Sequence, residues 1–125
     1  MLAATNPLGM PPKDEILAVA KAYMCFALTN TALYRLMFSS EIRQGSSEAL
    51  EEASSSTFTV LLDILTRGQQ SGVFKAGALQ GQAAACWALV HGLTMLELDR
   101  LLMPEKVGEQ PVAAALAVLL EGLVA

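Results

Sequence analysis

Residues 78–103 are the stretch that most constrains the fold. Their sequence, ALQGQAAACWALVHGLTMLELDRLLM, is apolar almost throughout, and the few polar side chains scatter around a helical wheel. A helix without a polar face has to be buried on most of its sides. One stripe of this helix carries no bulk, so a second helix can approach it closely; the stripe consists of Gly81, Ala84, Ala85, Ala88 and Gly92.

A second stripe on the same helix is large, aromatic and sparingly polar. It contains Trp87, His91, Thr94 and Leu98, which helical spacing brings onto one side. This stripe either lines a ligand cavity or fills an ordinary core. His91 is accordingly either a buried imidazole bonded to a neighbouring helix or part of a cavity wall. The indole N–H of Trp87 needs a partner in both cases.

Four more helices are predicted around this stretch. Pro12 is suited to open the first, and Asp14 and Glu15 place acidic side chains at the positive end of its dipole. At 125 residues the chain is long enough for one core and too short for two domains. We predict an all-α five-helix bundle over residues 13–125, after a loose lead-in at 1–12, with helices at 13–29, 31–38, 47–67, 78–103 and 111–124.

The helix predicted at 47–67 carries two hydroxyl groups on its apolar face. Ser54 and Thr57 project from the face that also bears Phe58. They either point into a cavity and orient a ligand, or bond back to the carbonyl four residues earlier. Gly68 is expected to end this helix, because glycine is common just past a helix C-terminus. The turn after it is expected to place Phe74 in the core.

The last helix, 111–124, has Glu121 as its only charged side chain. Only 16% of the residues in the chain are charged. A terminal helix that is apolar on all sides would leave a large exposed apolar patch on a monomer. We therefore expect a homodimer in which helices 78–103 and 111–124 of two copies form an isologous four-helix interface. From the last helix, Ala113, Ala117 and Leu120 are expected to join the small residues of the central stretch.

Composition argues against several classes of function. A net charge of −4 and singly scattered basic residues argue against binding to nucleic acid. No apolar run reaches the ~18 residues that a membrane span needs, and no export signal is visible, so we expect a cytoplasmic protein. One histidine and two separated cysteines, Cys25 and Cys86, supply neither a catalytic pair nor a metal site. We predict no enzyme activity, no metal and no cofactor.

Residues 87–92, Trp-Ala-Leu-Val-His-Gly, are similar to the Trp-His-Gly signature in the C-terminal domain of one branch of the tetracycline-repressor (TetR) family of bacterial transcriptional regulators. Residues 22–27, residues 32–38 and the turn at 72–74 resemble further segments of that branch, in the same order. The resemblance runs from about residue 13 to 102. Where the family commonly has His-Pro before the second helix, this chain has Asn30-Thr31.

The resemblance implies an effector-binding and dimerisation domain that senses a small apolar molecule, without the helix-turn-helix head of such regulators and so without DNA binding of its own. The alternative is a stand-alone dimerisation module that pairs with a full-length relative and inhibits it. By resemblance the effector cavity lies among the middle helices, and we expect it to be lined by Tyr34, Phe38, Phe58, Trp87 and His91, with Ser54 and Thr57 as further candidates.

Overall fold

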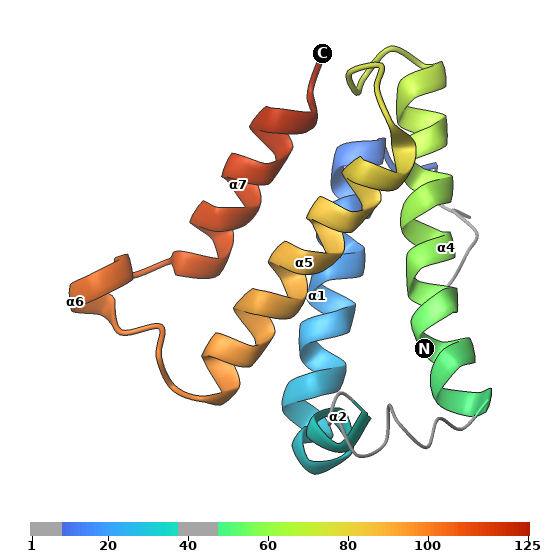
Figure 1. Ribbon diagram of the computed structural model, residues 1–125. Helices are drawn as coiled ribbons and strands as arrows, with labels where there is room; N and C mark the ends of the chain where they lie inside the picture. The colour runs from blue at the N-terminus through green and yellow to red at the C-terminus, as the bar shows by residue number, and fades with distance from the viewer. Residues whose placement is uncertain (1–8, 38–47) are drawn as a thin grey trace.

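The computed structural model describes residues 9–37 and 48–125, and of residues 48–55 it describes the backbone alone (Figure 1). The all-α fold with the five expected helices is confirmed. A sixth, single-turn helix lies in the segment that was expected to be a linker. The helices are α1 (Pro12–Thr29), α2 (Thr31–Met37), α4 (Glu48–Gln70), α5 (Leu79–Leu98), α6 (Pro104–Val107) and α7 (Pro111–Leu123).

The helices α1, α4 and α5 form the centre of the bundle, and each packs against the other two (Figure 1). The helix α7 packs on α5, and α2 leaves the end of α1 at an angle of 106°. Within the described residues, no single helix is long and apolar enough to cross a bilayer; α1 and α2 reach that length only when they are counted together across their bend.

The bend between α1 and α2 is centred on Asn30. Its side-chain Nδ2 donates to the carbonyl of Phe26 at 3.1 Å, so the side chain closes the end of α1. Its own carbonyl accepts the N–H of Tyr34 at 2.8 Å and so begins α2. Asn30 therefore serves both helices, with its side chain turned back to the first one. This geometry directs Tyr34 toward the core.

Two adjoining clusters of buried side chains make up the core. The first gathers around Ile64, Leu65 and Phe74, and the second around Ala27 and Tyr34. Trp87 packs against both clusters and lies at the boundary between them. The expected placement of Phe74 in the core is confirmed, because only 2% of its surface is exposed.

The helix α4 continues to Gln70, so the prediction that Gly68 ends it was wrong. Gly68 serves a close approach instead: a Cβ at this position would lie 2.1 Å from Cδ2 of Phe74. The residue that turns the chain in the left-handed region is Gly72, with φ +80°. Sequence alone does not separate these two uses of glycine, because one depends on a side chain that arrives from the following turn.

The helix α5 ends at Leu98, short of the predicted Met103. Arg100 has φ +57°, and the N–H of Leu101 donates to the carbonyl of Leu96 while the N–H of Arg100 donates to the carbonyl of Glu97. This pair of hydrogen bonds is the Schellman motif, with arginine at the position that usually holds glycine. The apolar character of residues 101–103 concealed this end, because the motif is visible only in the backbone.

Two sets of contacts attach the C-terminal residues and the first turn of α1 to the rest of the bundle. After α7, Val124 pairs with Phe74 in an isolated antiparallel bridge, in which the N–H of Lys75 donates to the carbonyl of Leu123 at 2.7 Å. In the first turn of α1, Glu15 is 8% exposed, and Arg67 of α4 donates to both of its carboxylate oxygens. The bundle is thus closed at the end where α4 passes into α5.

Candidate ligand pocket and interface

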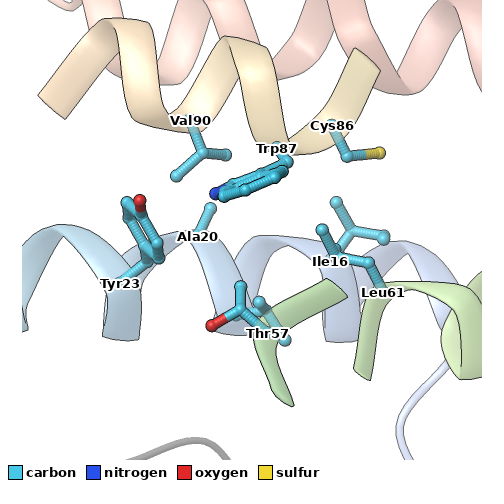
Figure 2. A pocket seen from close by; sticks show the side chains of 9 residues that line it. Ile16, Ala20, Tyr23, Thr57, Leu61, Cys86, Trp87 and Val90 are labelled. Carbon is cyan, nitrogen blue, oxygen red and sulfur yellow. The ribbon is translucent and has the colours of Figure 1, made fainter. Parts of the chain in front are cut away.

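A small pocket lies at the boundary between the two core clusters, where α1, α4 and α5 meet (Figure 2). It leaves about 10 Å³ of room, which is about the space that one water molecule needs. None of its lining residues is charged. They are Ile16, Val19, Ala20, Tyr23, Thr57, Leu61, Cys86, Trp87 and Val90.

Trp87 forms one wall of this pocket. Its ring lies 6.1 Å from that of Phe58, centroid to centroid, at an interplanar angle of 35°. Its Nε1 is buried and has no hydrogen-bond partner among the described residues. A buried N–H without a partner is uncommon and calls for an explanation from the site that surrounds it. The partner that this indole N–H needs is therefore not found among the described residues.

A hydrogen-bonded triad of Tyr23, Tyr34 and His91 adjoins the pocket. These side chains come from α1, α2 and α5, and the two tyrosine rings meet edge to face at 5.7 Å. The hydroxyl of Tyr34 lies 3.0 Å from that of Tyr23 and 2.6 Å from Nδ1 of His91, and the Tyr23 hydroxyl lies 3.1 Å from the same nitrogen. Tyr23 belongs both to this triad and to the pocket wall.

The protons of the triad can be assigned from its contacts. Tyr34 donates to Tyr23, which uses the single proton of its hydroxyl. The contact of 2.6 Å between Tyr34 and Nδ1 of His91 must then be an N–H of the imidazole donating to the Tyr34 oxygen. That nitrogen no longer accepts a proton from Tyr23. The hydroxyl proton of Tyr23 is therefore not used within the triad.

The surroundings of the two tyrosines fit this assignment. Burial raises the pKa of Tyr34 above its usual range, and donation to Tyr23 raises it further. Burial also raises the pKa of Tyr23, while the hydrogen bond from Tyr34 and the nearby Trp87 oppose that shift. The indole nitrogen lies near the Tyr23 hydroxyl, although the two are not within hydrogen-bonding geometry. Both phenols stay neutral at physiological pH.

The structure brings some of the expected lining residues together. Thr57 and Trp87 line the pocket, Phe58 packs on Trp87 from outside it, and Tyr34 and His91 lie in the adjoining triad. Thr57 is buried, so its place on the inner face of α4 is as expected. Phe38 and the side chain of Ser54 lie outside the described residues.

Sequence reasoning missed Tyr23, which the geometry makes central. Tyr23 lies on the apolar face of α1 with Ile16 and Ala20, and these three residues all line the pocket. A hydroxyl-bearing aromatic residue on an otherwise apolar face was the signal that it has a polar role. Cys86 of the core also borders the pocket, and burial raises the pKa of its thiol to about 11.

Most of the residues expected at a dimer interface are exposed in the single chain. Gly81, Ala84, Ala85 and Ala88 are exposed, and Gly92 is partly exposed with nothing within 4 Å of a Cβ built on it. On α7, Ala113 and Ala117 are exposed and Leu120 is partly buried. The small residues of α5 are therefore uncovered within one chain, and the expectation that a second copy covers them stays a prediction. The residues of α5 that this chain buries are Ala83, Cys86, Val90, Leu93 and Thr94.

Residues 16–123 match the family described as "Tetracyclin repressor-like, C-terminal domain". No curated protein matches the chain significantly. Among solved structures, a protein with unknown function from Rhodococcus sp. RHA1 is similar, with a TM-score of 0.72 and 23% sequence identity. The match covers 91% of this chain and 58% of that one, so this chain spans little more than half the length of its structural relative. At this identity the likeness shows the fold alone.

Proposed function

The chain belongs to the family of tetracycline-repressor-like C-terminal domains, and we propose that it senses a small apolar molecule and dimerises as the effector domain of a bacterial transcriptional regulator. The observation that carries the sensing role is the uncharged pocket between α1, α4 and α5, which Trp87 closes. Apolar walls with a few placed polar groups are typical of small-molecule sites. No catalytic role is assigned to these residues.

Sensing through this pocket would act on the packing of three helices. A ligand larger than one water molecule has to move the lining side chains apart, because the room present is about 10 Å³. The pocket lies where the two core clusters meet, so widening it shifts one cluster against the other. A ligand that binds only the widened arrangement shifts the population toward it. This arrangement of helices would be the signal that the regulator transmits.

Dimerisation is the second half of the proposal. The small residues of α5 are exposed, Val118 of α7 is 68% exposed, and α7 packs on α5. We infer that these two helices present one apolar surface for pairing. Small side chains let two helices approach closely, and a two-fold axis along this surface would bring α5 and α7 of two copies together. The net charge of −4 fits pairing and sensing better than contact with DNA phosphates. Two free cysteines fit a bacterial cytoplasm.

Ligand binding is tested with the chain's single tryptophan. Small apolar compounds are titrated while Trp87 fluorescence and the melting temperature are recorded. A compound that binds the pocket changes the emission and raises the melting temperature, because it stabilises the folded state. If no apolar compound in a broad panel does either, the sensing role is wrong.

Dimerisation is tested by Gly92→Leu in sedimentation velocity. Nothing in the chain lies within 4 Å of a Cβ at this position, so the leucine fits a single folded chain. Between two closely packed helices it would overpack the interface and weaken the dimer by roughly 10- to 100-fold. The matched control is Ala18→Leu, which adds the same side chain at an exposed position of α1. A monomeric wild type, or equal association of all three proteins, would reject the interface.

A further inference from the structure

The pocket presents two hydrogen-bond donors at one end. One is the buried Nε1–H of Trp87, which has no partner among the described residues. The other is the hydroxyl proton of Tyr23, which the triad does not use because Tyr34 and His91 both direct their protons toward tyrosine oxygens. Figure 2 shows the indole nitrogen and the Tyr23 hydroxyl at the same end of the pocket, beside Val90.

We propose that the molecule sensed here is a neutral carbonyl compound with an apolar body, whose oxygen accepts hydrogen bonds from Trp87 and Tyr23 together. This inference rests on the proposed function and specifies the ligand of the same pocket. One carbonyl oxygen has two lone pairs, so it can satisfy both donors at once. A hydrocarbon offers no acceptor and would leave both protons unpaired.

The uncharged wall selects against ionic ligands. None of the lining residues is charged, so a carboxylate or an ammonium group would lose its hydration without a counter-charge. The carboxylate of Glu15, next to Ile16 in the chain, is already held by Arg67 through two hydrogen bonds. A cation therefore finds no free carboxylate there, and an anion finds only the two neutral donors.

The size of the pocket determines where the rest of the ligand lies. The room present holds little more than the carbonyl group itself. Val19 and Trp87 line the pocket and are only partly buried, so the apolar body would enter where these two side chains now close it. Movement of Trp87 on binding is then required, and its fluorescence reports the event directly.

The test compares acetophenone with α-methylstyrene, in which a methylidene group replaces the carbonyl oxygen and the remaining shape is kept. Binding to the full chain is followed by Trp87 emission, and the single indole N–H resonance is followed by ¹H–¹⁵N NMR. We expect acetophenone to bind about tenfold more tightly. We also expect it, and not the hydrocarbon, to shift the indole proton downfield, as hydrogen bonding does.

Three variants test which residues cause the tighter binding of acetophenone than of α-methylstyrene. Trp87→Phe and Tyr23→Phe each remove one donor, and the preference for the ketone in a thermal-shift titration should fall toward equal affinity. Thr66→Val removes a hydroxyl of the same helix α4 that lies outside the pocket and donates to the carbonyl of Leu62 at 2.7 Å, and it should leave the preference intact. If a donor variant does not fold, the NMR shift of the wild type still decides the question.

The outcomes separate the two proposals. Equal affinity of both probes, or an indole proton unmoved by the ketone that binds, overturns the carbonyl assignment and leaves apolar sensing in place. The same holds if the preference persists in both donor variants. If neither probe binds the wild type while other apolar compounds do, the carbonyl assignment alone is wrong. If no compound binds, both proposals are wrong.

Discussion

Replacing Gly68 by alanine tests whether the packing of Phe74 explains the course of α4. In the interior of an exposed helix this substitution stabilises by up to about 1 kcal/mol, because glycine is a poor helix former. Here the new Cβ would lie 2.1 Å from Cδ2 and 2.6 Å from Cε2 of Phe74. Since Phe74 is 2% exposed and its N–H donates to the carbonyl of Gly68 at 3.0 Å, the ring and its backbone have to move together.

The expected magnitude follows from these distances. Inserting a methyl group into a packed core typically costs about 1–3 kcal/mol. The gain in helix propensity offsets up to about 1 kcal/mol of that cost. We therefore expect Gly68→Ala to lower the free energy of unfolding by about 1–2 kcal/mol. Complete expulsion of the ring would set an upper limit of about 3–5 kcal/mol, as for removal of a buried phenylalanine.

Urea denaturation followed by circular dichroism measures this effect, with every protein at the same protomer concentration because a dimer gains stability with concentration. The control is Gly122→Ala in α7, where a Cβ meets nothing within 4 Å and no loss is expected. In a Phe74→Ala background, Gly68→Ala should be neutral or stabilising, which gives a coupling energy of at least about 1 kcal/mol. Stabilisation in the wild-type background, or the same change in both backgrounds, would refute the explanation.

Four further outcomes are expected. Arg100→Gly should raise the free energy of unfolding by up to about 1 kcal/mol in urea denaturation, because Arg100 has φ +57° and glycine adopts that region without strain. Arg67→Met should lower the free energy of unfolding by about 1–2 kcal/mol, since Glu15, which is 8% exposed, loses the two hydrogen bonds from Arg67. The Arg67 side chain is 35% exposed, and this exposure limits the loss. The free energy of unfolding should fall as the pH rises from about 9 to 11. The Cys86 thiol has a usual pKa of 9.0 and burial raises it to about 11, so the unfolded chain releases the thiol proton at a lower pH than the folded chain does. Cys86→Ala should make the free energy of unfolding less dependent on pH in this range. A disulfide reagent should label exposed Cys25 quickly in the folded protein and Cys86 only after unfolding.

The local sequence pattern predicted the helices and several of their first residues correctly. Pro12 and Pro111 begin α1 and α7, as a rigid φ without an N–H favours at the first helical turn. The predicted ends at Gly68 and Met103 failed, because Phe74 and the left-handed Arg100 act through tertiary packing and backbone geometry. Neither cause has a sequence period, so helix ends were the weakest part of the prediction.

The candidate site was only partly predictable. Trp87 and Thr57 were placed on inward faces by helical spacing, and both line the pocket. His91 was left between a structural and a lining role, and it lies in the triad beside the pocket. Tyr23 was overlooked, because one hydroxyl on an apolar face carries no information about which distant residue it will meet.

By itself the sequence determined that the chain is helical, that α5 has one bulky and one small side, and that the single tryptophan lies on the bulky side. Those properties are local, since they follow from the spacing of residues along one helix. The tertiary structure alone decided that Tyr23, Tyr34 and His91 meet, across separations of up to 68 residues. Hydrogen bonds of about 3 Å depend on how three helices are positioned by all of their packing contacts, and no short stretch of sequence contains that information.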